Sequence, residues 1–157
     1  MEIYLVQHGE AKSEEEDNHR PLTDVGMSEV AAVAVALKRH DLRVSAIWHS
    51  GKLRAKQTAV EYAEALEPGD GVHEKAGLGP QDDPQRMAEA LVGLDVPTMV
   101  VGHLPHLSRL VSLLTVDDPD REIVRFRQGG VLCLARTEGG WRIAWYLTPE
   151  LAEVVTA

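Results

Sequence analysis

Ile3-Tyr4-Leu5-Val6-Gln7-His8-Gly9-Glu10 is an apolar run that is followed directly by polar residues. Four consecutive apolar residues are typical of a strand buried on both faces, as in a parallel sheet, so we predict a strand over residues 2–7. In open α/β sheets, binding residues follow the carboxyl ends of the strands. His8 is therefore a candidate site residue.

A similar pattern occurs at Met99-Val100-Val101-Gly102-His103-Leu104-Pro105, where we predict a strand over residues 97–102. His103 and His8 thus both follow a short apolar strand, which indicates one composite site. A neutral imidazole can attack phosphorus, and a second imidazole can hold the phosphoryl oxygens as charge redistributes. The two histidines therefore favour phosphoryl transfer.

The rest of the chain alternates between helix and strand patterns. Apolar spacing and turn residues predict helices over 24–40, 52–66, 84–94 and 105–115, and strands over 44–48, 131–136 and 141–147. The last two strands flank a glycine-rich turn and are expected to form a hairpin. This order predicts a single domain over residues 1–157: a three-layer α/β/α sandwich with a mostly parallel central sheet.

Composition excludes several classes of function. The 157 residues include 16 Lys and Arg against 25 Asp and Glu, a net charge of −9, which opposes binding to nucleic acid or to anionic membranes. Cys133, the single cysteine, lies in an apolar run and is expected to be a core thiol in a reducing compartment. The first residues resemble neither a signal peptide nor a membrane span, so we expect a cytoplasmic protein.

A third segment, from His49 to Thr58, leads from a predicted strand into a helix. Arg54 is expected in the first helical turn, where free N–H groups and the helix dipole already favour an anion. Its guanidinium adds a two-pronged donor for phosphate oxygens. Arg54 is therefore the third candidate at the same edge of the sheet.

Four segments together resemble the histidine phosphatase superfamily, and within it the small phosphohistidine phosphatases of the SixA-like branch. Gln7-His8-Gly9 stands where the family has Arg-His-Gly, and Ser50 to Thr58 matches its Ser-x-x-x-Arg-Ala-x-Gln-Thr pattern. Arg20-Pro21-Leu22-Thr23 and His103-Leu104-Pro105 match two segments of the small branch. The matches follow the family order from residue 7 to residue 105.

The resemblance implies a phosphoglycerate-mutase-like fold and a phosphatase without metal or cofactor. By it, His8 is the nucleophile that becomes phosphorylated, while Arg54 and His103 contact the phosphoryl oxygens. The other residues expected to bind phosphate are Gln7, Gly9, Lys12, Arg20 and Ser50. The implied substrate is phosphohistidine, on a protein partner, with a small phosphomonoester as the alternative.

Gln7 departs from the family pattern, which has arginine there. A neutral amide forfeits part of a charge-assisted hydrogen bond, roughly 1.5–3 kcal/mol, or about one to two orders of magnitude in rate. Arg20 and Lys12 are two candidates to supply the missing cation. A further alternative is a pseudo-enzyme that binds phosphate or a phosphoprotein without turnover.

Other polar residues have simpler interpretations. His106 lies three residues after His103 and raises the alternative of a metal cluster with His8. A general acid is not evident in the pattern, and the candidates for it are Glu10, Asp82 and Asp83. The acidic segment Ser13–Asp17 is expected to be a solvated loop, with the alternative that it rims the site and repels acidic substrates. The remaining histidines, His19, His40, His49 and His73, are expected to be structural or solvated.

Overall fold

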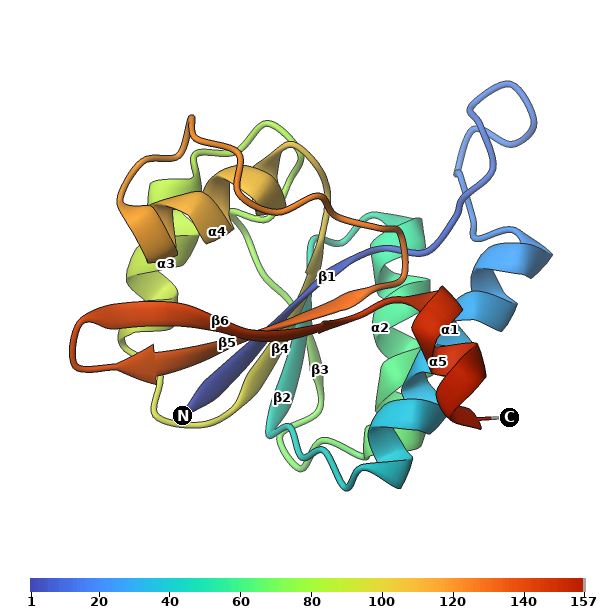
Figure 1. Cartoon of the computed structure of the whole chain (residues 1–157). Helices are drawn as coiled ribbons and strands as arrows, with labels where there is room; N and C mark the ends of the chain where they lie inside the picture. The colour runs from blue at the N-terminus through green and yellow to red at the C-terminus, as the bar shows by residue number, and fades with distance from the viewer. Residues whose placement is uncertain (157) are drawn as a thin grey trace.

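A six-stranded sheet with the order β3-β2-β4-β1-β5-β6 lies at the centre of the molecule (Figure 1). The structure is a computed structural model that describes residues 1–156. Its strands are β1 (Glu2–Gln7), β2 (Ala46–His49), β3 (Val72–Glu74), β4 (Thr98–Gly102), β5 (Val131–Thr137) and β6 (Gly140–Leu147). The pairs among β3, β2, β4 and β1 are parallel, whereas β5 pairs antiparallel with both of its neighbours. The predicted, mostly parallel sheet is confirmed.

Helices cover both faces of this sheet. The described residues contain α1 (Asp24–Arg39), α2 (Leu53–Leu66), α3 (Pro84–Val92), α4 (His106–Val116) and α5 (Pro149–Thr156). Figure 1 shows α1, α2 and α5 on one face and α3 with α4 on the other. Alternate side chains of β1 accordingly belong to two apolar clusters, with Tyr4 and Val6 in one and Ile3 and Leu5 in the other. The predicted three-layer α/β/α sandwich is confirmed.

Two elements lie outside the predicted pattern. β3 is a strand of three residues at the sheet edge, too short to show an alternation of apolar and polar side chains. α5 is a helix of eight residues that packs against α1 after the final hairpin. The strand predicted to begin at Val44 begins at Ala46, and the predicted single domain ends at Ala157, which lies outside the described residues.

The strand register places three loops at one edge of the sheet. Gln7 of β1 pairs with Gly102 of β4, and Val101 of β4 pairs with His49 of β2. Because these strands are parallel neighbours, the residues that follow them emerge side by side. Within residues 1–156, no helix has both the length and the apolar character needed to cross a membrane.

Candidate active site

His8 and His103 lie together at the carboxyl ends of β1 and β4. Their ring centroids are 5.0 Å apart, with 54° between the ring planes. Both side chains are buried, with 6% of His8 and 2% of His103 exposed. The structure therefore brings together the two histidines that the sequence analysis singled out.

The hydrogen bonds of His8 leave one ring nitrogen available. Its Nδ1 lies 2.7 Å from the carbonyl oxygen of Gly9, which can only accept, so Nδ1 carries the proton and Nε2 keeps its lone pair. The pKa of His8 is lowered to about 4, mainly by burial; the bond to Gly9 raises it, and the charges of Arg54 and Arg20 also lower it. His8 is therefore neutral at physiological pH, as a nucleophile must be.

His103 is held by a residue of the neighbouring strand end. Its Nε2 lies 2.6 Å from Oγ of Ser50, which directly follows β2. The pKa of His103 is lowered to about 3, mainly by burial and to a smaller extent by the nearby His8 and Arg54. Within residues 1–156, Nδ1 of His103 is buried without a hydrogen-bond partner. Its ring is thus a neutral, fixed group beside the His8 ring.

Arg54 lies in the first turn of α2, as predicted. Burial lowers its pKa, and so does the nearby charge of Arg20, whereas Glu14 of the β1–α1 loop raises it. Among the described residues, Nε of Arg54 is buried and has no hydrogen-bond partner. A cation in this position can stabilise the negative charge on a phosphoryl group in the transition state of its transfer.

Thr58 joins the His8 loop to α2, a role that the sequence analysis missed. Its Oγ1 accepts a 3.0 Å hydrogen bond from the Gly9 N–H and donates a 2.8 Å bond to the Arg54 carbonyl. Gln57 acts in the same way one residue earlier, because its Oε1 accepts from the Leu22 N–H at 2.7 Å. The side chains that follow Arg54 thus position the residues around it.

Two glycines allow the His8 loop to approach α1 closely. A Cβ on Gly9 would lie 2.9 Å from a methyl carbon of Val30, and one on Gly26 would lie 2.2 Å from the carbonyl oxygen of Glu10. Gly26 was not singled out from the sequence. The N–H of Gly9 is used by Thr58, so the expected contact of Gly9 with phosphate stays a prediction.

Arg20 and Lys12 differ in what they offer the site. The Arg20 side chain donates from Nε to the Lys12 carbonyl oxygen at 2.9 Å, and its charge lowers the pKa of both His8 and Arg54. Lys12 is exposed and contributes this main-chain carbonyl. Arg20 is therefore the better placed of the two candidate cations.

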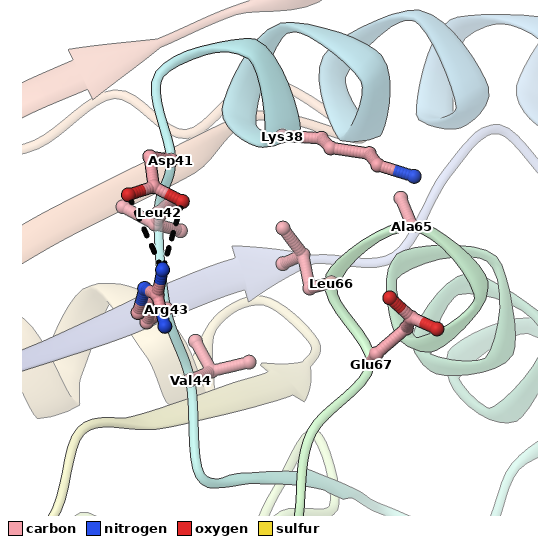
Figure 2. Close-up of a pocket in the computed structure, with 8 residues that line it drawn as sticks. All are labelled: Lys38, Asp41, Leu42, Arg43, Val44, Ala65, Leu66 and Glu67. Atoms are coloured by element: carbon pink, nitrogen blue, oxygen red, sulfur yellow. Dashed lines mark hydrogen bonds and ion pairs between the residues drawn. The ribbon is translucent and has the colours of Figure 1, made fainter.

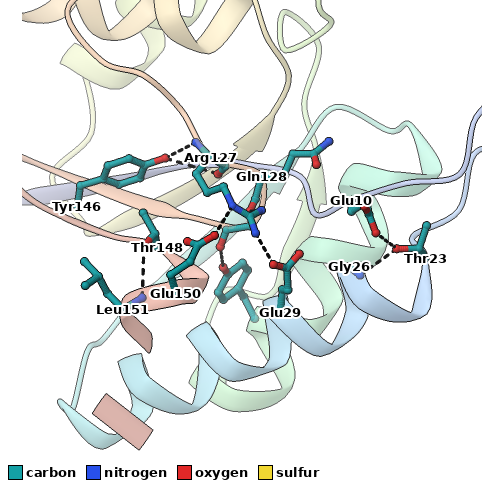
Figure 3. A network of polar contacts seen from close by, with 12 residues as sticks. Glu10, Thr23, Gly26, Glu29, Arg127, Gln128, Tyr146, Thr148, Glu150 and Leu151 are labelled. Atoms are coloured by element: carbon teal, nitrogen blue, oxygen red, sulfur yellow. Dashed lines mark hydrogen bonds and ion pairs between the residues drawn. The ribbon is translucent and has the colours of Figure 1, made fainter. Parts of the chain in front are cut away.

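Gln7 is fixed through its main chain by the segment before β5. Its carbonyl oxygen accepts from the Gly129 N–H at 2.9 Å, and Oε1 of its side chain is buried with no partner among residues 1–156. Arg127 holds that segment by ion pairs to Glu29 of α1 and Glu150 of α5 (Figure 3). This network ties three distant parts of the chain to the end of β1.

The acids proposed from sequence all have structural partners. Glu10 accepts a 2.6 Å bond from Oγ1 of Thr23, the N-cap of α1 (Figure 3). Asp82 accepts from the Gly79 N–H at 2.8 Å, and Asp83 caps α3. Their proposed catalytic role stays a prediction, and each already stabilises a turn or a helix end.

The remaining histidines do not extend the site. His19, His40 and His73 are exposed, as expected, and Nδ1 of His49 accepts from the Gly51 N–H at 3.0 Å. His106 is buried, and burial lowers its pKa. Within residues 1–156, no three histidine, cysteine or acidic side chains are grouped so as to hold a metal ion, so the alternative of a metal cluster has no geometric support.

A cavity of about 380 Å³ lies at the other end of the molecule (Figure 2). It is lined by Lys38, Asp41, Leu42, Arg43, Val44, Ala65, Leu66 and Glu67, from the ends of α1 and α2 and the chain before β2. These residues include no histidine, and the charged ones lie at or near helix ends far from the strand-end histidines, so the histidine pair is the better candidate for phosphoryl transfer.

Comparison with known proteins agrees with this geometry. The family described as "Histidine phosphatase superfamily (branch 1)" matches residues 3–79. A structure of the protein histidine phosphatase SixA complexed with tungstate is 26% identical, with a TM-score of 0.82 over 95% of this chain and 97% of that one. An uncharacterized protein of Picosynechococcus sp. (strain ATCC 27264 / PCC 7002 / PR-6) is 29% identical over 96% of this chain and 93% of its own length.

A more distant structure shares the fold. A phosphoserine phosphatase mutant from Entamoeba histolytica, in complex with phosphoserine, is 15% identical with a TM-score of 0.73. The match covers 96% of this chain and 98% of that one. At this identity the likeness concerns the fold alone.

Proposed function

The chain belongs to the histidine phosphatase superfamily, and we propose that it hydrolyses phosphohistidine on a protein partner through a phosphorylated His8. The observation that carries this proposal is the neutral His8 ring, whose Nε2 is unprotonated and which lies beside His103. The chain would act as one phosphatase domain and, as its composition suggests, in the cytoplasm.

The first chemical step is a transfer between two imidazoles. The Nε2 lone pair of His8 attacks phosphorus, the bond from phosphorus to the substrate nitrogen breaks, and the leaving imidazole takes a proton from solvent. Arg54 and Arg20 stabilise the charge on the phosphoryl oxygens, and His103 lies beside them as a neutral, fixed partner. Water then attacks the phosphoryl group, breaks its bond to His8 and releases inorganic phosphate.

This choice of substrate follows from the leaving group. An imidazole nitrogen departs readily once it is protonated, so a dedicated acid is less necessary than for an alcohol. Glu10, Asp82 and Asp83 all have structural hydrogen bonds, which suits a substrate of this kind. A small phosphomonoester is the second candidate, and the test below includes two compounds of this class.

A binding protein without turnover is the third candidate, and the observation that favours it is Gln7. The site has one cation fewer than the family pattern, which weakens stabilisation of the transition state. Binding of phosphate needs less of that stabilisation than turnover does. A phosphorylated His8 separates the two, because only turnover forms it.

The test compares substrates and follows His8. Phosphate release from a phosphohistidine peptide should exceed release from phosphoserine and from a sugar phosphate. Rapid quenching should show the mass of one phosphoryl group on the peptide that contains His8. His8→Ala should abolish both signals, whereas the exposed His40→Ala should retain them. Release near the wild-type rate by His8→Ala would refute the proposed mechanism.

A further inference from the structure

Apolar side chains are exposed along one side of α2, next to the site. Leu53 and Val60 of α2 are 37% and 40% exposed, and Met27 of α1 is 36% exposed. They border a groove of about 190 Å³ whose lining is Met27, Leu53, Lys56, Gln57, Val60 and Glu61. These residues, which we call the α1–α2 groove, belong to neither apolar core cluster.

Their spacing makes this a continuous surface rather than scattered residues. Leu53 and Val60 are seven residues apart, so they lie on one side of α2, with Lys56 and Gln57 between them. The exposed side of a helix in a globular protein is normally polar. An apolar groove on that side is typical of a surface that binds another molecule.

The groove begins next to the candidate active site. Leu53, at one end of it, directly precedes Arg54 in the first turn of α2. Gln57, in its wall, also holds the segment after Arg20 through the N–H of Leu22. An α-helix rises about 1.5 Å per residue, so Val60 lies only about 9 Å beyond Arg54 along the helix axis. A polypeptide substrate that places a phosphoryl group at Arg54 is therefore within reach of the groove.

Charge and size indicate the occupant. Lys56 and Glu61 line the groove and Lys52 precedes Leu53, so two lysines stand against one acid here, although the whole chain carries a net charge of −9. An apolar cavity of about 150 Å³ holds benzene, so this groove has room for a leucine or phenylalanine side chain. Its surroundings suit a polypeptide with an apolar side chain next to an acidic one, rather than a small phosphomonoester.

We propose that the α1–α2 groove binds an apolar side chain of the protein substrate, three or four residues from its phosphohistidine. This inference rests on the proposed function. The offset follows from the reach of an extended chain, about 3.3 Å per residue, which spans about 10–13 Å in three or four residues. Binding at this distance distinguishes a polypeptide from free phosphohistidine.

The test is a double-mutant cycle between the enzyme and a peptide. Two peptides, chemically phosphorylated on a single histidine, carry either leucine or serine at offsets of three and four residues on each side. Val60→Ser should lower kcat/KM about tenfold for the leucine peptide and leave the serine peptide and free phosphohistidine unchanged. Val92→Ser, at a 64% exposed position on α3, is the matched control and should change none of them.

A second variant tests the charge. Lys56→Glu should lower kcat/KM for a leucine peptide that carries aspartate beside the leucine. It should raise kcat/KM for a leucine peptide that carries lysine there. Equal effects of Val60→Ser on the leucine and serine peptides would overturn the inference. The inference would also be overturned if the wild type were a dimer and Val60→Ser a monomer, because a second copy of the chain would then occupy the groove.

Failure of the proposed function gives a different result. In that case no phosphohistidine substrate releases phosphate, with or without leucine. Calorimetric binding of the same two peptides then still tests the groove, since it requires no turnover. Tighter binding of the leucine peptide to wild type than to Val60→Ser would support the groove, and equal binding would refute it.

Discussion

Protonation of His8 should destabilise the folded protein, and the size of the effect follows from its burial. The pKa of His8 is lowered from 6.5 to about 4 in the folded structure, with burial as the main cause. Below pH 6.5 the unfolded chain takes up a proton at this residue, whereas the folded chain does so only near pH 4. The stability that His8 contributes is therefore fully present above pH 6.5 and decreases as the pH falls toward 4.

The expected magnitude is large enough to measure. At about pH 5 the unfolded state is almost fully protonated at His8 and the folded state almost not at all. Linkage then gives a loss of about 2 kcal/mol relative to neutral pH, because one pKa unit corresponds to about 1.4 kcal/mol. The same protonation removes the lone pair on Nε2, so kcat/KM should stay flat from about pH 8 to pH 5.5 as far as His8 is concerned.

The assay compares variants at two pH values. The free energy of unfolding is measured with urea at about pH 7.5 and pH 5 for wild type and for His8→Gln. Between the two pH values it should fall by about 2 kcal/mol less in His8→Gln than in wild type. His40→Gln, at an exposed position, should leave the loss unchanged. Titration of the ring protons by NMR gives the pKa directly. A pKa for His8 near 6.5, or an equal loss of stability in both variants, would refute the argument from burial.

Four further substitutions test the site. Thr58→Val leaves the buried N–H of Gly9 without its acceptor, so the free energy of unfolding in urea should fall by about 1–3 kcal/mol and kcat should be lower. Unchanged values would contradict the positioning role of Thr58. Arg20→Ala should lower kcat/KM at least tenfold, and Gln7→Arg should raise it about tenfold by adding a two-pronged donor. A neutral or harmful Gln7→Arg would mean that Arg20 already fills that space. Glu10→Gln should lower the melting temperature and change phosphohistidine hydrolysis less than tenfold, whereas a larger loss would identify Glu10 as a required acid.

The layers of the fold follow from local patterns of apolar residues that can be recognised in the sequence alone. Four apolar residues before Gln7 predict a strand buried on both faces, and β1 lies in the middle of the sheet. β3 could not be predicted, because three residues carry no period and it exists only by pairing with β2. α5 was missed for a similar reason, since eight residues depend on packing against α1 for their stability.

Some residues of the site were likewise predictable from the sequence and others were not. His8 and His103 were predictable because residues at strand ends share one edge of a parallel sheet, whatever the details of packing. Thr58 and Gln57 were not assigned a role, because their partners lie 49 and 35 residues away in the sequence. Two signals pointed to the site: both residues belong to the matched segment Ser50–Thr58, and their positions three and four residues after Arg54 place them on the same side of α2.

Gln7 and the α1–α2 groove have opposite effects on kcat/KM. The missing cation at Gln7 forfeits roughly 1.5–3 kcal/mol, and a fully buried leucine side chain contributes a similar roughly 1.5–3 kcal/mol. The two contributions act at different stages, however. A cation on the phosphoryl oxygens binds the transition state more tightly than the substrate and raises kcat, whereas the groove binds both equally and lowers KM. A chain with Gln7 and the groove would therefore be slow at saturation and yet effective at low concentrations of a protein substrate, an advantage that free phosphohistidine does not share.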